Sequence, residues 1–430
     1  MRVLSTLAEL DAKLDECRLA RAVSDDALRA VFAGFTGRFV LDHPVDPFSG
    51  EYRRFQMRLY ERFARRVYTT ANEATLFDVD ANVTRPFPYA TGSAITAGQH
   101  LGAVAYLLRC LRLQPGASVL EFGAGWGNTT IPLAQLGFRV TAVDVDPRFC
   151  ELLRRRAQLS GVEIDVIESD FFWAEQCSDR FDAVVFFECF HHCEDHLRLL
   201  QALHRIVADD GRVYFGAEPI LADYPVPWGL RMDGEALWAI GTHGWLELGF
   251  RESYFRTALA RTGWIGRPSR SVDLPWISVW EASRHSGAPI VVTALDARLG
   301  TMTGRKTGSR TAGRIEIEAE TDGYGVFGPH VPLPAGSYRG VMRFTAGAPL
   351  AGALTLDVCC ERGVRIVAAS PVDTDEARTA GFASVDFALE AGADEVEVRL
   401  FAVAGAVASV DSVIIETAQQ GQDIAGQFRT

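Results

Sequence analysis

The chain has 430 residues, of which 48% are hydrophobic and 23% charged, and a formal net charge of −12. This length predicts two or three domains with large cores, and the composition is that of a soluble globular protein. The negative charge argues against a nucleic-acid backbone or an anionic membrane as main partner, and leaves a small-molecule or glycan acceptor open.

The beginning of the chain has no secretory signature, because Glu9, Asp11 and Asp15 interrupt any apolar run. There is also no stretch of about eighteen apolar residues, so no membrane span is expected. The eight cysteines lack a C-x-x-C spacing. We therefore expect reduced thiols in a cytoplasmic protein.

Two apolar stripes predict an N-terminal helical cap over residues 1–95. The stripes are Leu4, Leu7, Leu10 and Leu14, followed by Phe55, Leu59, Phe63 and Val67. A segment that contains proline and glycine, residues 83–93, then leads into a helix expected from about Thr96 to Leu111.

Strands and helices alternate from Ser118 to about Arg284, which predicts a mostly parallel sheet with helices on both faces. The expected strands are 118–122, 139–143, 163–167, 182–187, 211–217, 264–272 and 276–282. We assign residues 96–285 to this domain. The connection over residues 218–261 is an insertion rich in Trp, Gly and Pro. Long connections in compact domains often form lids or binding loops.

The first strand of this domain runs into a glycine-rich loop, Val119-Leu-Glu-Phe-Gly-Ala-Gly-Trp-Gly127. Glycines at alternate positions let the backbone turn tightly and approach a ligand. Seventeen residues after Gly127, the second strand ends in Asp144, where a carboxylate meets a ribose diol if a nucleoside lies across the strand ends. Position 128 is Asn, which disfavours the dinucleotide pattern G-x-G-x-x-G.

The pattern E-x-G-x-G-x-G resembles that of the class I S-adenosylmethionine-dependent methyltransferases, and the resemblance covers residues 85–284. It implies a Rossmann-like α/β domain with S-adenosyl-L-methionine as cofactor. It also implies that Glu121 lies beside the methionine end, that Asp144 holds the ribose and that Asp170 accepts from the adenine amino group. The cofactor-binding residues so implied are Tyr89, Glu121, Gly123, Gly125, Gly127, Asp144, Asp170 and Phe171. The alternatives are a glycine-rich turn without a ligand and a packing role for Tyr89.

A second constellation, Phe186-Phe-Glu-Cys-Phe-His-His-Cys-Glu-Asp-His196, leaves the fourth strand at the edge where such sheets bind ligands. Histidine can accept a proton from an acceptor hydroxyl near neutral pH. We take His192 as the candidate base, with His191 and Glu188 in reserve; the alternative is that the two histidines only shape the cofactor pocket. We expect no metal, although His191, His192 and His196 keep a metal-assisted reaction open.

The insertion supplies the candidates for acceptor binding, because sugars are commonly held by aromatic faces and polar side chains. These candidates are Trp228, Arg231, His243 and Trp245.

Beyond residue 286, short β-patterned runs separated by Gly, Pro and Asp turns predict an all-β sandwich over residues 286–420. This region resembles carbohydrate-binding modules and jelly-roll domains at the level of fold, and a structural or oligomerisation role is the alternative. The combination suggests methyl transfer to a hydroxyl of a sugar or surface glycan. Methylation of oxygen or nitrogen on a natural-product scaffold, and a cofactor-binding but inactive glycan-binding or scaffold protein, remain alternatives.

Overall fold

The computed structural model describes residues 1–39, 44–272, 274, 277–301, 309–311, 313–361 and 363–418. It divides into two compact units. The first consists of Met1–Phe255 with Gly266–Ser283, and the second of Arg256–Ile265 with Arg284–Thr430. The domain limits inferred from composition, 95/96 and 285/286, stay predictions.

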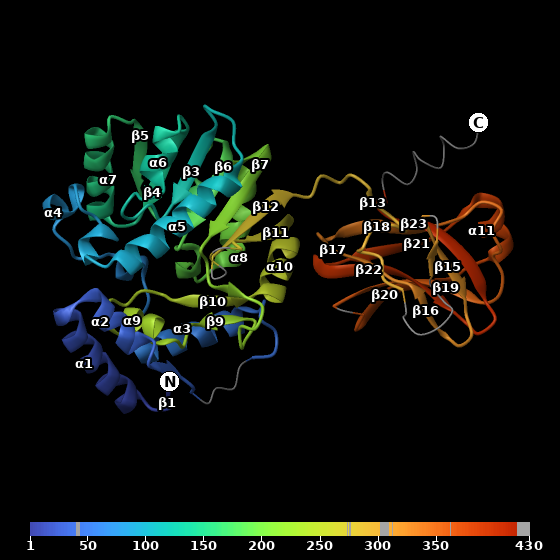
Figure 1. Cartoon of the computed structure of the whole chain (residues 1–430), viewed down its shortest axis with the longest axis horizontal. Helices are drawn as coiled ribbons and strands as arrows, with labels where there is room; N and C mark the ends of the chain where they lie inside the picture. Colours follow the sequence, from blue (N-terminus) through green and yellow to red (C-terminus); the bar gives the residue numbers. More distant parts are fainter. Residues whose placement is uncertain are drawn as a thin grey trace. The chain divides into compact units, whose positions relative to one another are not determined.

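The first unit is built on a seven-stranded sheet in the order β11-β12-β7-β6-β3-β4-β5 (Figure 1). The strands are β3 (Ser118–Phe122), β4 (Arg139–Asp144), β5 (Ile164–Glu168), β6 (Phe181–Phe187), β7 (Val207–Gly216), β11 (Trp264–Arg270) and β12 (Ser278–Arg284). The pairs from β7 to β5 are parallel, and β12 runs antiparallel to β7. The expected Rossmann-like α/β fold is therefore confirmed.

The central strands are buried on both faces, which explains their continuous apolar sequences. Val119, Leu120 and Phe122 of β3 are fully buried. The helices that alternate with these strands along the chain are α5 (Ala94–Leu111), α6 (Thr130–Gln135), α7 (Pro147–Ser160), α8 (His196–Ile206) and α10 (Glu252–Arg261). Leu107 of α5 and Val185 of β6 belong to one core cluster, so this helix packs on the sheet.

The N-terminal cap is mainly helical, as the apolar stripes predict, but it also contains two short parallel strands. Its elements are β1 (Arg2–Leu4), α1 (Leu7–Val23), α2 (Asp25–Phe32), β2 (Phe35–Gly37), α3 (Gly50–Ala64) and α4 (Val79–Val83). For two residues of the apolar stripes, the predicted helical position is wrong. Leu4 lies in β1, and Val67 lies beyond α3 because the helix ends where Arg65 takes a left-handed conformation with φ of 56°.

The insertion packs with the cap and forms a layer with it, which the sequence did not indicate. The insertion contains β8 (Ile220–Leu221), β9 (Trp228–Leu230), α9 (Gly234–Thr242) and β10 (Leu248–Arg251). The amide of Gly37 donates to Met232 O at 2.7 Å, and the hydroxyl of Tyr52 donates to Trp228 O at 2.9 Å. Figure 1 shows α1, α2, α3 and α9 gathered with β9 and β10.

The second unit contains two antiparallel sheets that enclose one core, consistent with the expected β-sandwich. The six-stranded sheet holds β13 (Ile290–Thr293), β14 (Ser309–Thr311), β15 (Arg314–Glu318), β18 (Gly336–Phe344), β21 (Phe382–Leu389) and β23 (Val407–Thr417). The five-stranded sheet holds β16 (Gly323–Val326), β17 (Pro329–Leu333), β19 (Leu354–Cys360), β20 (Arg365–Pro371) and β22 (Ala393–Ala402). A helix, α11 (Thr374–Ala380), precedes β21.

The cysteines agree with the reduced state that we expect. All eight are free thiols, and seven of them are buried. Within the described ranges, no helix combines the length and the apolar character that crossing a membrane requires.

Candidate active site

The glycine-rich loop follows β3 and is packed on one side and bare on the other. Gly123 and Gly125 have φ of 64° and 47°, a region that strongly favours glycine. A Cβ at Gly123 would lie 2.7 Å from Cys189 Cβ, whereas a Cβ at Gly125 would meet only Gly123 O, at 3.9 Å. The loop is thus held against the turn after β6 and leaves open space beside Gly125 for a ligand.

Two buried carboxylates flank the loop. Asp144, at the end of β4, accepts from Gly125 N at 2.8 Å and from Asp146 N at 2.9 Å, and burial raises its pKa to about 6. Glu121 accepts from the hydroxyl of Thr129, and burial raises its pKa to about 7. Within the described residues, Glu121 Oε2 is buried without a partner, so the loop retains an unused acceptor. The open backbone and this acceptor fit a cationic nucleoside.

The adenine candidates lie after the third strand. Asp170 caps a short 3₁₀ turn by accepting from Phe172 N at 2.8 Å, and the ring of Phe171 lies 5.9 Å from that of Phe122. Both follow the carboxyl end of β5, close in the sheet to Asp144. Tyr89 lies on a separate 3₁₀ turn, Tyr89–Thr91, and is 45% exposed.

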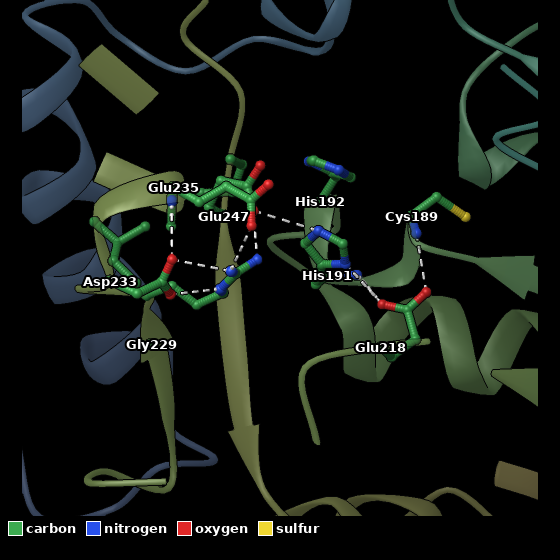
Figure 2. A network of polar contacts seen from close by, with 12 residues as sticks. Cys189, His191, His192, Glu218, Gly229, Asp233, Glu235 and Glu247 are labelled. Atoms are coloured by element: carbon green, nitrogen blue, oxygen red, sulfur yellow. Dashed lines mark hydrogen bonds and ion pairs between the residues drawn. The ribbon is translucent and has the colours of Figure 1, made fainter. Parts of the chain in front are cut away.

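The turn after β6 fixes His191 between two carboxylates (Figure 2). Glu218 accepts the backbone N–H groups of Cys189, Phe190 and His191 at 2.9 to 3.1 Å. Its Oε2 also lies 2.7 Å from His191 Nδ1, while His191 Nε2 lies 3.5 Å from Glu247 Oε2. Both ring nitrogens of His191 therefore face carboxylates.

This arrangement keeps His191 charged. Burial by itself lowers the pKa of His191, but Glu218 and Glu247 outweigh it and raise the pKa to about 10. Burial opposes ionisation of Glu247, yet His191 and Arg231 lower its pKa to about 2. An imidazolium has no lone pair, so His191 cannot serve as a base near neutral pH.

His192 has a different environment. Its Nδ1 lies 3.2 Å from Glu73 Oε2, and its carbonyl accepts from the Tyr68 hydroxyl at 3.0 Å. Its ring lies 4.2 Å from that of His191, centroid to centroid. Nδ1 is buried and forms no aligned hydrogen bond with the described residues. Of the two histidines, His192 is the one that could hold a free nitrogen lone pair.

Glu188 lies in another part of the site. It has φ of 53°, and its Oε2 lies 3.3 Å from Nδ1 of His100, not beside His192. His100 Nε2 in turn lies 3.0 Å from Asn128 Nδ2, next to the glycine-rich loop. This position favours a role in supporting the loop over a role as base.

Two acceptor candidates are already engaged. Trp228 is 2% exposed and donates its indole N–H to Pro47 O at 2.8 Å, so its polar atom is used in packing against the cap. Arg231 donates to Asp233 at 2.9 and 3.1 Å and to Glu247 at 3.1 Å. Arg231 therefore contacts the same carboxylate, Glu247, that faces His191.

The other two acceptor candidates are stacked on one another. The rings of His243 and Trp245 lie 4.5 Å apart, and burial lowers the pKa of His243 to about 4. The indole N–H of Trp245 is a buried donor without a hydrogen-bond partner among the described residues.

His191, His192 and Glu247 each offer one ligand atom within 4.8 Å of the others, so this cluster could hold a metal ion. His196, the third histidine of the motif, is not in this group. Its Nε2 lies 2.7 Å from the Tyr254 hydroxyl, and burial lowers its pKa to about 4. A metal at the cluster would have to displace the Glu247 contact of His191.

The sequence reasoning missed Glu73, Glu218 and Glu247. Glu218 directly follows the fifth predicted strand, 211–217, so its place at the carboxyl edge of the sheet was a usable signal. Glu247 lies two and four residues after the predicted acceptor residues Trp245 and His243. Glu73 lies in the cap without any motif, and only the tertiary structure brings it to His192.

Comparisons with known proteins bear on the class of this domain. Residues 119–211 match the family model described as "Methyltransferase domain". The fold and the glycine-rich loop define this part of the chain as a Rossmann-like, S-adenosylmethionine-dependent methyltransferase domain.

Two curated relatives are both described as ubiquinone biosynthesis O-methyltransferase. That of Methylocella silvestris is 31% identical over 30% of this chain and 51% of its own length. That of Xanthomonas axonopodis pv. citri is 32% identical over 24% and 44%. The chain thus spans about half the length of the curated relatives it matches. A TehB-like methyltransferase structure from Corynebacterium glutamicum is 18% identical over 43% of this chain and 88% of its own, with a TM-score of 0.31.

Proposed function

We propose that this protein transfers the methyl group of S-adenosylmethionine to a hydroxyl oxygen of a sugar or glycan. The observation that carries the proposal is the position of His192, which lies on the turn after β6, three residues after the Cys189 that packs against Gly123 of the loop. Its neighbour His191 is held as a cation between Glu218 and Glu247.

The chain's own residues would perform three tasks. The bare backbone at Gly125, with Asp144 and Asp170, binds and orients the donor. His192 accepts the proton as the acceptor O–H bond breaks, and the oxygen electron pair forms the new O–CH₃ bond. The S–CH₃ electron pair stays on sulfur, which leaves as a neutral thioether. Alignment of the two reactants supplies most of the remaining acceleration.

The acceptor class is inferred from the chemistry beside His192. Glu73 and Glu247, the stacked rings of His243 and Trp245, and the free indole N–H of Trp245 offer polar and aromatic contacts. These groups suit a polyhydroxylated acceptor better than an apolar one. The β-sandwich unit supports the same choice, as a module that could bind the glycan.

The names of the curated relatives favour a second candidate, O-methylation of a small aromatic molecule. Both candidates require the same donor and base, and they differ only in the acceptor. An inactive scaffold would bind the donor without forming S-adenosylhomocysteine.

The test is acceptor screening with purified full-length protein, in which S-adenosylhomocysteine is measured by mass spectrometry. Nucleotide sugars, oligosaccharides and catechol-type phenols form the three arms. In parallel, glycans and metabolites from cells that lack the protein are searched for a missing methyl increment. Turnover with a carbohydrate supports the proposal, and turnover only with phenols transfers it to the second candidate. Donor binding without product in any arm favours the scaffold.

A further inference from the structure

His192 faces one carboxylate that comes from the cap. Glu73 Oε2 lies 3.2 Å from His192 Nδ1, and both side chains are largely buried, at 14% and 18% exposure. Among the described residues, no other carboxylate forms an ion pair with His192. His191 is different, since each of its ring nitrogens faces a carboxylate.

The carboxylate of Glu73 is held in place on its other side. Glu73 Oε1 accepts from Leu246 N at 3.0 Å, next to Trp245 in the insertion. Glu73 ends a 3₁₀ turn, Thr70–Glu73, and Asn72 of this turn donates to the Tyr60 hydroxyl of α3 at 3.0 Å. The segment is thus fixed by both the cap and the insertion.

The backbone of His192 is fixed by the same segment. The hydroxyl of Tyr68, five residues before Glu73, donates to the carbonyl oxygen of His192 at 3.0 Å. Two side chains of residues 68–73 therefore reach one histidine, one to its backbone and one to its ring. A short turn with two such contacts is suited to setting the ring orientation.

We propose that Glu73 is the positioning residue of the base, a role that rests on the proposed function of His192. Its carboxylate accepts the Nδ1–H of His192, so that Nε2 carries the lone pair that takes the acceptor proton. When the proton arrives, Glu73 stabilises the imidazolium. The Nδ1 contact is short in distance but not aligned as a hydrogen bond. Catalytic hydrogen bonds are often poorly aligned without substrate, and a small ring rotation would align this one.

Glu73→Gln is the decisive substitution because it is isosteric. Its carbonyl can still accept from Leu246 N, while its amide would donate to His192 Nδ1. This reverses the tautomer, placing the proton on Nε2, where the base needs a lone pair. Glu73→Asp keeps a carboxylate at shorter reach, and Glu61→Gln, on the exposed face of α3, is the matched control.

Two measurements separate this role from a structural one. Nitrogen-15 NMR of labelled histidine, without acceptor, is expected to find His192 as the Nδ1–H tautomer in the wild type and as Nε2–H in Glu73→Gln. With an identified acceptor, kcat of Glu73→Gln is expected to fall about 100-fold or more. Its Kd for S-adenosylmethionine should stay unchanged, and Glu73→Asp should recover part of kcat.

An unchanged tautomer in Glu73→Gln would overturn the proposal, and so would equal kcat values for Glu73→Gln and Glu61→Gln. Loss of donor affinity in Glu73→Gln would also overturn it, because it would assign Glu73 a structural role. Failure of the proposed function gives another pattern. In that case His192→Ala keeps full turnover, while the tautomer change in Glu73→Gln is still observed.

Discussion

The donor side and the acceptor side of the proposed active site are built in different ways. Apart from Tyr89, the donor candidates come from one stretch of chain, Glu121 to Phe171, and lie at or directly after the carboxyl ends of β3, β4 and β5. The acceptor side combines Glu73 of the cap, His191 and His192 after β6, Glu218 after β7, and Arg231 and Glu247 of the insertion. A site made from strand ends can be recognised from sequence, whereas a site made from packed segments depends on the tertiary fold.

The largest expected effect is on the chemical step, where loss of a residue of the acceptor side should lower kcat and leave donor binding intact. His192→Ala should lower kcat about 10²- to 10⁴-fold, the usual contribution of a general base, with the donor Kd unchanged. Steady-state kinetics and calorimetry measure the two quantities. His330→Ala, in the second unit, serves as control. Retention of full kcat would remove His192 from the mechanism.

The acceptor side also contains a buried ion pair whose loss affects folding. Glu218→Gln should lower the free energy of unfolding by about 3 kcal/mol at neutral pH, because it removes one partner of His191 and Glu247 remains. Denaturant titration followed by fluorescence measures this. The matched substitution Glu61→Gln should have little effect, and equal stability of the two variants would argue against an ionised pair.

On the donor side, Asp144→Ala should weaken binding of S-adenosylmethionine about 10- to 100-fold. The substitution removes the carboxylate that we propose as the ribose partner, which is also the acceptor that holds Gly125 N. Calorimetry with the donor alone measures this. Asp165→Ala, on the exposed side of β5, is the control. An unaltered Kd would mean that the nucleoside does not lie across Asp144.

The pH dependence of stability sharpens the contrast because, among the described residues, the histidine whose pKa is strongly raised, His191, lies on the acceptor side. The folded pKa of His191 is about 10 against 6.5 when unperturbed. Its stabilising contribution is therefore complete below pH 6.5 and is lost as pH rises toward 10. Glu247, with a pKa near 2 in place of 4.5, loses its contribution as pH falls through that range. The midpoint temperature of thermal unfolding should fall between pH 7 and 10 more steeply for the wild type than for Glu218→Gln. Parallel plots of this temperature against pH for the two proteins would contradict this.

The smallest expected effect is that of chelation. We expect turnover to survive prolonged treatment with a chelator, because ion pairs engage His191 and Glu247 in place of metal. Kinetics before and after treatment, with elemental analysis of the protein, measure this. A loss of activity that is restored by one divalent cation would show instead that His191, His192 and Glu247 hold a metal.

The sequence determined the fold class and the donor loop, because both depend on local order. The period of apolar residues predicted the strands of the sheet to within a few residues. The tight turn of the loop requires positive φ at positions 123 and 125, a conformation that glycine adopts readily. The regular β pattern likewise predicted the antiparallel sheets of the second unit.

Only the tertiary structure distinguishes the surroundings of the two adjacent histidines. His191 and His192 are adjacent and chemically identical in the sequence, yet Glu218 and Glu247 enclose one of them and Glu73 faces the other. These carboxylates lie far from the motif along the chain and carry no periodic signal. Burial and ion pairing set the charge state of a histidine, and both are properties of the packed structure.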